Sequence, residues 1–484
     1  MNNTIKSIIL ATLLMSLTQI ASAAPQNDSW GNATALTSTT VGQMSGSLNG
    51  ATVQQCEPDH LFPDEAGSPA EKTVWYKWQA PASGSYTFSF DGSETTIDPV
   101  LSAYKLQPGL CNGAPALTPD RIIENHNYNT DLGISQVSSI TFRADAGETI
   151  HIAVDSWFGQ EGNFKLIWRK AKFRYDANLD HKNSGADLAV TRVASGGLQW
   201  WTARYRNASI FSTFSAQMYG IQFDKTFMAD YDGDGISDMV AVRKANGTSV
   251  WWIANRDGQI IKIVQFGLDT DTPIIGDYDG DGIADITVIR GDEGANTKTW
   301  HILRSSDGHY TGAQFGLAND REMAGDYDGD GKTDLVVQRV ENGSLRWYIH
   351  RSGSNEVVTR LFGNSTGDYP QNVDLDGDGK TDIAMFRRFS SPSQPSPYEG
   401  YWFSLDSSSP LPLDQVPTRF EKFGAAFDEP QPADFDGDGR TDLAVYRDGV
   451  WWVRQSTNGQ AAIHHFGTAS DRPLTDGGRF VLSF

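Results

Sequence analysis

The stretch "GDYDGDG" occurs at residues 276–282 and recurs unchanged at residues 325–331. Near copies read "ADYDGDG" at 229–235, "VDLDGDG" at 373–379 and "ADFDGDG" at 433–439. Each copy continues to one more Asp, so all five fit the pattern DxDxDGxxD. Carboxylates at alternating positions of a short turn can converge on one cation, and Gly permits the sharp bend. The pattern therefore predicts five cation-binding loops.

The predicted ligands are the Asp residues at positions 1, 3, 5 and 9 of each loop: Asp230, Asp232, Asp234 and Asp238; Asp277, Asp279, Asp281 and Asp285; Asp326, Asp328, Asp330 and Asp334; Asp374, Asp376, Asp378 and Asp382; Asp434, Asp436, Asp438 and Asp442. An all-oxygen ligand set favours Ca²⁺ over Zn²⁺, which prefers His and Cys. An EF-hand differs because it places Glu at position 12 and is flanked by helices. We expect five Ca²⁺ ions that mainly stabilise the fold.

Each loop belongs to a longer repeat. The loops start 47, 49, 48 and 60 residues apart, and each is followed by a strand ending in Arg, an aromatic strand and Phe-Gly. A degenerate first copy begins at residue 175, which makes six units of roughly four strands each. Modules of this size predict a β-propeller, whereas a solenoid needs shorter repeats. Six blades are favoured, and seven stay possible because the tail "RPLTDGGRFVLSF" (472–484) could begin another unit or close the ring.

The order Phe-Gly, strand, DxDxDGxxD closely resembles the FG-GAP/VCBS repeats of integrin α-subunit propellers and of many bacterial exported proteins. The resemblance covers residues 171–484. It implies that each Asp loop joins the first two strands of a blade and binds Ca²⁺. The first copy departs from the pattern, because Asp176, Asn178, Asp180 and Asp187 fit it only with three extra residues.

The chain before residue 171 follows another pattern. Between residues 25 and 170, short segments rich in β-branched and aromatic residues alternate with Gly, Asp, Ser and Pro, as in "TVWYKWQA" (73–80) and "GSYTFSF" (84–90). They predict a β-sandwich. Residues 27–169 resemble the bacterial pre-peptidase C-terminal domain, a small sandwich appended to secreted enzymes and surface proteins. The segment "ENHNYNTDLG" (124–133) stands where that family often has Asn-Asp-Asp.

Residues 1–23 have the features of a signal peptide, with Lys6 before an apolar stretch and Ala21-Ser22-Ala23 at the end. No later stretch is apolar enough to span a membrane. We therefore expect a protein that is secreted or held at a bacterial cell surface or in the periplasm. A net charge of −21 argues against binding nucleic acid. The two cysteines, Cys56 and Cys111, form a disulfide or remain as two buried thiols.

A second candidate site lies opposite the Asp loops. The strand after each loop ends in an Arg, and the link after Phe-Gly usually carries an Asp, at Asp271, Asp320, Asp368, Asp428 and Asp471. The residues form either Arg–Asp pairs that lock each blade or a ring that binds acidic or sugar ligands. One member of each aromatic pair should be buried, which leaves its neighbour exposed. The candidate ligand-binding residues are Arg243, Arg290, Arg339, Arg387, Arg447, Trp252 and Trp452, with Arg192 as the equivalent in the first unit.

Catalytic motifs are scarce in this sequence, which has no G-x-S-x-G, H-E-x-x-H or Walker loop. The favoured interpretation is a secreted, calcium-stabilised, non-catalytic binding or adhesion protein that recognises a glycan or another protein. A secreted glycan-degrading or other hydrolytic enzyme is the alternative, and a purely structural surface component is a third possibility. The Ser- and Pro-rich insert at 387–400 is expected to be an exposed loop.

Overall fold

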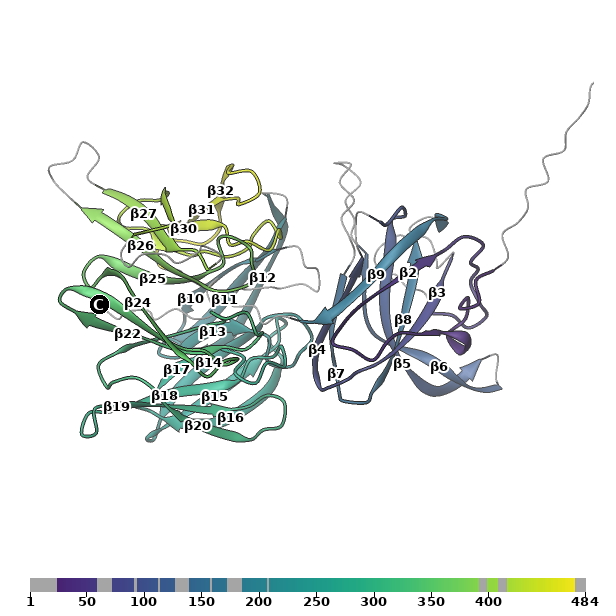
Figure 1. Cartoon of the computed structure of the whole chain (residues 1–484), viewed down its shortest axis with the longest axis horizontal. Coiled ribbons are helices and arrows are strands. Elements are labelled where there is room, and N and C mark those ends of the chain that lie inside the picture. The colour runs from purple at the N-terminus through teal and green to yellow at the C-terminus, as the bar shows by residue number, and fades with distance from the viewer. Residues whose placement is uncertain are drawn as a thin grey trace, which may run out of the picture.

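The computed structural model describes residues 24–58, 72–90, 94–111, 114–126, 139–156, 159–171, 185–206, 209–390, 398–407 and 416–474. Its strands form two lobes that lie side by side (Figure 1). Within the described ranges the only helical element is a short 3-10 turn, Trp30–Asn32. No helix among these residues is long and apolar enough to cross a membrane. The predicted signal peptide lies outside the described residues.

The N-terminal lobe is a β-sandwich of two sheets. The first sheet has the order β1 (Thr34–Ala35), β3 (Val74–Gln79), β8 (Thr149–Ser156), β5 (Pro99–Cys111), β6 (Ala114–His126). The second has the order β2 (Val41–Ser47), β9 (Asn163–Lys170), β4 (Gly84–Phe90), β7 (Ser139–Ala144). Only β1 pairs in parallel with its neighbour, β3. The predicted sandwich is thus present, although β1, β2 and β6 were not among the expected strands.

The sandwich core lies between these two sheets. Alternate residues point inward, so Tyr76 and Trp78 of β3 meet Phe88 of β4 and Trp168 of β9 in one buried cluster. This alternation is what the sequence pattern predicts for strands that are buried on one face. Cys111 ends β5, and its side chain lies outside the described residues, so the disulfide with Cys56 stays a prediction.

The C-terminal lobe consists of six four-stranded sheets, here numbered first to sixth along the chain. The first is β33 (Arg472–Pro473), β10 (Leu188–Ala194), β11 (Gly197–Arg206), β12 (Ser209–Ile221). The second is β13 (Lys225–Ala229), β14 (Asp238–Ala245), β15 (Thr248–Ala254), β16 (Ile260–Leu268), and the third is β17 (Thr272–Ile274), β18 (Ile286–Asp292), β19 (Thr297–Leu303), β20 (Tyr310–Gln314).

The remaining sheets repeat this antiparallel order. The fourth is β21 (Arg321–Gly325), β22 (Asp334–Glu341), β23 (Ser344–His350), β24 (Val357–Asn364), and the fifth is β25 (Asp368–Val373), β26 (Asp382–Ser390), β27 (Tyr398–Leu405), β28 (Arg419–Lys422). The sixth is β29 (Glu429–Pro430), β30 (Leu443–Arg447), β31 (Val450–Arg454), β32 (Ala461–His465). The β26–β27 ladder extends to Ser390 and Tyr398, so the ends of the predicted insert loop are strand.

Six hydrophobic clusters join these sheets in a ring. Each cluster is shared by two consecutive sheets, and one joins the sixth sheet to the first through residues such as Phe435 and Tyr205. The C-terminal strand β33 pairs with β10, so the first sheet contains strands from both ends of the lobe. Part of the predicted tail therefore completes the first sheet, and residues 475–484 lie outside the described ranges.

A buried tryptophan on the third strand of each sheet explains the aromatic repeat. These six residues are at most 1% exposed, and each indole N–H donates to the backbone oxygen of the aromatic residue before the repeat's Gly: Trp200 to Tyr219, Trp251 to Phe266, Trp300 to Phe315, Trp347 to Phe362, Trp402 to Phe423 and Trp451 to Phe466. Burying an indole requires such an acceptor. The expectation that one member of each aromatic pair is buried is confirmed.

Candidate calcium loops and the arginine face

Each of the five Asp loops joins the first and second strands of its sheet, as the resemblance implied. The first Asp folds its own loop. In the second sheet, Asp230 accepts the N–H of Gly233 at 2.6 Å on one oxygen and the N–H of Gly235 at 2.9 Å on the other. The same two bonds recur in the other four loops. The backbone is thereby curled around the carboxylates.

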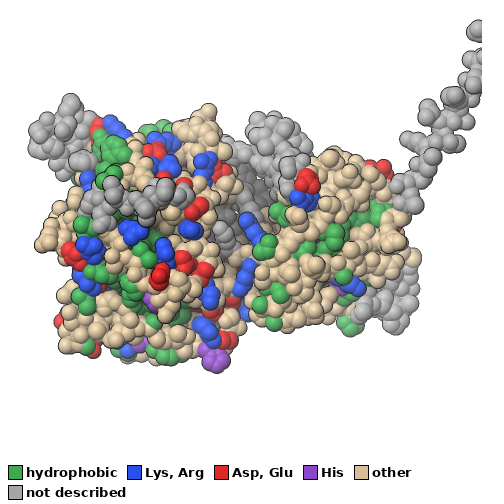
Figure 2. Space-filling model, viewed as in Figure 1, with side chains coloured by type: hydrophobic (Ala, Val, Ile, Leu, Met, Phe, Trp, Pro, Cys, Tyr) green, Lys and Arg blue, Asp and Glu red, His purple; other side chains and the backbone are tan. Residues whose placement is uncertain are grey.

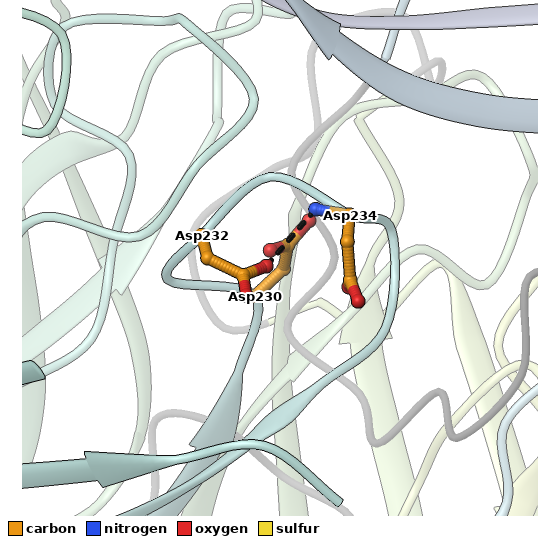
Figure 3. Close-up of side chains that lie close together, drawn as sticks. All are labelled: Asp230, Asp232 and Asp234. Carbon is orange, nitrogen blue, oxygen red and sulfur yellow. Dashed lines mark hydrogen bonds between the residues drawn. The ribbon is translucent and has the colours of Figure 1, made fainter. Parts of the chain in front are cut away.

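The structure brings three carboxylates of each loop within 4.8 Å of one another. In four loops these are positions 1, 3 and 9, and in the second sheet they are Asp230, Asp232 and Asp234. Figure 3 shows the latter group, where the backbone N–H of Asp234 donates to Asp232. The position-5 carboxylate instead accepts the N–H of position 7 in every loop. In four of the loops this carboxylate lies outside the group of three.

The chemistry of these loops fits a hard divalent cation. Burial and the charges of neighbouring carboxylates raise the pKa of Asp285 to about 7 and that of Asp238 to about 9. The Oδ2 atom of Asp281 is buried and has no hydrogen-bond partner among the described residues. Buried carboxylates with raised pKa values and an unpartnered oxygen form a set of donors that a cation could stabilise in the charged form. Ca²⁺ would be held by the Asp oxygens and would offset their repulsion.

The loops are also bonded to one another. In the loops of the third to sixth sheets, the residue at position 8 donates its N–H to the backbone oxygen of position 1 in the preceding loop: Ala284 to Asp230, Thr333 to Asp277, Thr381 to Asp326 and Thr441 to Asp374, at 2.7 Å each. Where position 8 is Thr, its hydroxyl also accepts the N–H of that Asp. In the first unit, the backbone N–H of Ala186 donates to the backbone oxygen of Asp434 in the same way. The five loops thus form a linked series around one end of the ring.

The position-9 Asp ties each loop to its own sheet. In the third sheet, Asp285 accepts the N–H of Tyr278 at 2.7 Å and that of Ser305, beyond the third strand, also at 2.7 Å. The fourth, fifth and sixth sheets repeat both bonds. Position 9 therefore has a structural role in addition to its place in the carboxylate group.

At the opposite end of the second strand, Arg–Asp pairs clamp all six sheets, which confirms the pairing that the sequence suggested. Each guanidinium donates two hydrogen bonds to one carboxylate: Arg192 to Asp471, Arg243 to Asp224, Arg290 to Asp271, Arg339 to Asp320, Arg387 to Asp368 and Arg447 to Asp428. The Asp side chains are 0–3% exposed, whereas the Arg side chains are 25–42% exposed. We call this end of the ring the arginine face.

Aromatic rings stack on the Arg side chains in five of the six sheets. Arg243 lies 5.6 Å from the ring centre of Trp252, and Arg447 lies 5.8 Å from that of Trp452. Arg192 has Trp201, Arg339 has Tyr348 and Arg387 has Phe403. Both Trp252 and Trp452 are half-buried. Each candidate Arg thus has a carboxylate at its edge and, except for Arg290, an aromatic ring over its face.

One clamp residue of the first repeat was missed from the sequence, and one candidate loop residue there has a backbone partner. Asp224 was missed as a clamp because Tyr219-Gly220 replaces Phe-Gly before it. The constant spacing of 19 residues between Asp and Arg would have identified it. Asp187 accepts the backbone N–H of Tyr205 at 2.8 Å. The other candidates of the first copy, at 176, 178 and 180, lie outside the described residues.

The Asp-loop end of the ring faces the sandwich. A cavity of about 450 Å³ lies there, lined by the loops and by Ser85, Thr141 and Arg169 of the sandwich. Lys332 and Lys380, at position 7 of their loops, also line it. Lys and Arg side chains gather along the boundary between the lobes (Figure 2). The arginine face lies at the other end of the ring.

Comparison with known proteins agrees with the repeat structure. Residues 230–288 and 326–385 match the model of the FG-GAP-like repeat. Each segment starts at the first Asp of a loop and ends in the second strand of the next sheet. No curated protein matches the chain.

Two solved structures are similar in shape. The WD40 domain of Toxoplasma gondii coronin has 12% sequence identity and a TM-score of 0.33, over 62% of this chain and 73% of that one. The Dos1 propeller has 11% identity and a TM-score of 0.33, over 64% of this chain and 93% of that one. The fold assignment rests on strand pairing and packing, since these scores are low. Strand order and shared clusters together show that the C-terminal lobe is a β-propeller, and two of its segments match the FG-GAP-like repeat.

Proposed function

We propose that this chain is an exported, non-catalytic binding protein in which a six-bladed, calcium-stabilised propeller recognises a glycan or a protein through its arginine face. Five ions, one per Asp loop, would hold the blades at the other end of the ring. Residues 1–23 would direct export, and the sandwich would be an accessory domain similar to the pre-peptidase C-terminal family.

The observation that carries this proposal is the repeated Arg–aromatic pair on a rigid scaffold. Each Arg is fixed at one edge by a buried Asp, so its position does not depend on a ligand. The stacked rings next to it are partly exposed, as for Trp252 and Trp452. Aromatic faces bind the apolar faces of sugars, and preorganised side chains lose little entropy when they bind.

The charge of this surface favours ligands that also carry acidic groups. The Arg side chains keep a quarter to two fifths of their surface exposed, whereas the side chains of the partner Asp residues are buried. A partner that approaches the arginine face therefore meets positive charge and aromatic surface together. Acidic glycans and acidic protein segments have the complementary chemistry.

A glycan array probed with the full chain in calcium, followed by titration of the best ligand, tests the proposal. Trp252→Ala and Trp452→Ala should each weaken binding by about tenfold, as expected for aromatic contact residues. Phe420→Ala is the matched control, because Phe420 is an exposed aromatic on the outer strand β28. Equal binding by all three variants, or release of a cleaved product, would contradict the proposal.

A further inference from the structure

The sandwich lies directly against two of the five Asp loops, and one residue contacts both. The backbone N–H of Ser85, in β4, donates to the backbone oxygen of Asp281 at 2.7 Å. The Ser85 hydroxyl reaches the backbone oxygen of Gly233 at 3.4 Å. Asp281 belongs to the loop of the third sheet and Gly233 to that of the second. The contacts therefore join the sandwich to the Asp loops themselves.

The two backbones approach so closely that side chains are excluded. A Cβ atom at Gly282 would lie 3.1 Å from the Cβ of Ser85 and 3.2 Å from the backbone oxygen of Ala171. A Cβ at Gly235 would lie 3.1 Å from the Cβ of Thr141. The equivalent glycines of the fourth and sixth sheets, Gly331 and Gly439, have nothing within 4 Å at that position. The loops of the second and third sheets thus approach the sandwich closely at this position, whereas those of the fourth and sixth do not.

The sequence of these two loops differs from the others at the same place. Position 7 is Ile236 in the second sheet and Ile283 in the third, and both side chains are buried. In the fourth, fifth and sixth sheets, position 7 is Lys332, Lys380 or Arg440, each partly exposed. A charged residue is therefore compatible with the loop structure. The apolar residues occur only in the loops that contact the sandwich.

We propose that the loops 230–238 and 277–285 are a calcium-dependent docking surface for the chain's own N-terminal sandwich. Asp281 links the sandwich to this loop, because its backbone oxygen accepts the N–H of Ser85, while its buried Oδ2, next to the group of Asp277, Asp279 and Asp285, has no hydrogen-bond partner among the described residues. Without the ion, repulsion between carboxylates opens the loop, and the Ser85 contacts are lost. This inference rests on the proposed calcium binding and adds that the ions fix the orientation of the two lobes.

Small-angle X-ray scattering of the full chain, with calcium and after calcium removal, tests this docking. Removal should increase the radius of gyration and broaden the distribution of interatomic distances. Gly282→Val should have the same effect in the presence of calcium, because its side chain meets Ser85 and Ala171. Gly331→Val is the matched control, since its φ is +84° against +88° for Gly282 and no atom lies nearby. Gly235→Val and Gly439→Val form a second pair if the first variant fails to fold.

The outcomes separate the inference from the proposed function. Calcium titration of the same samples shows whether the ions bind at all, and failure there overturns both proposals. Calcium binding with identical scattering in its presence and absence overturns the docking inference alone. Equal scattering by Gly282→Val and Gly331→Val, both folded and calcium-bound, would likewise overturn it.

Discussion

At each Arg–Asp pair, a partly exposed guanidinium neutralises a carboxylate that is almost completely removed from water. A buried charge that loses its partner is strongly destabilising, whereas an exposed ion pair contributes little. The pair also anchors the link before the next blade, because the same Asp accepts a backbone N–H there, as Asp320 does from Leu317 at 2.8 Å. Each Arg–Asp pair thus joins the end of a sheet's second strand to the link that leads into that sheet.

Arg339→Met should lower the free energy of unfolding by about 3 kcal/mol, because Asp320 would remain buried without its partner. Arg304→Met is the control, since Arg304 and its partner Asp307 are each more than a third exposed, and a much smaller loss than for Arg339→Met is expected. Urea denaturation measures both variants. Similar small losses for the two would show that the clamp is not a stabilising element.

The Asp loop is an element in which backbone and carboxylates depend on each other. The Asp at position 1 accepts backbone N–H groups of its own loop, and the residue at position 8 bonds to the preceding loop. The Asp at position 9 accepts the N–H of a residue just beyond the third strand of the same sheet. These hydrogen bonds leave acidic groups close together and partly out of water. In the absence of an ion, protons are therefore the alternative source of neutralisation.

This arrangement predicts how metal-free protein responds to pH. Burial and neighbouring acids raise the pKa of Asp285, Asp382 and Asp442 to about 7, against about 3.9 in an unfolded chain. The folded state then binds more protons than the unfolded state between these values, so its stability falls as the pH rises through about 7. The melting temperature of metal-free protein should decrease from pH 5 to pH 8.

The calcium-loaded protein provides the control, because the ion replaces those protons. The gap in melting temperature between calcium-loaded and metal-free samples should widen from pH 5 to pH 8, while effects of net charge elsewhere largely cancel. A gap that stays constant or narrows as the pH rises would contradict the role of the loop carboxylates.

At the scale of the whole molecule, sequence alone predicted the two β-lobes, the repeat and its loops. Local signals were sufficient, since DxDxDGxxD, the Arg at the end of the next strand and the paired aromatics each recur at constant spacing. The buried Trp251 beside half-buried Trp252 follows from strand alternation in the same way. Such patterns arise from contacts within a sheet or between consecutive sheets.

Contacts between distant segments were not predictable from these patterns. The pairing of β33 with β10 was left open, because two residues of strand carry little signal. The contact between the sandwich and the Asp loops involves Ser85 and Gly282, which lie almost 200 residues apart in the sequence. Its only trace in the sequence is the change from Lys or Arg to Ile at position 7. The position-5 carboxylates were expected to join the others, but in four of the loops they lie outside the group of three.

The number of calcium ions bound per chain tests the account most directly. Equilibrium dialysis of the full chain should show five ions at saturating calcium, one for each carboxylate group, with dissociation constants of about 10⁻⁴–10⁻³ M, the range of extracellular calcium-binding modules. The double substitution Asp277→Asn and Asp279→Asn should lower that number by one. Binding of no calcium, or the same number in wild type and variant, would contradict the assignment of the Asp loops.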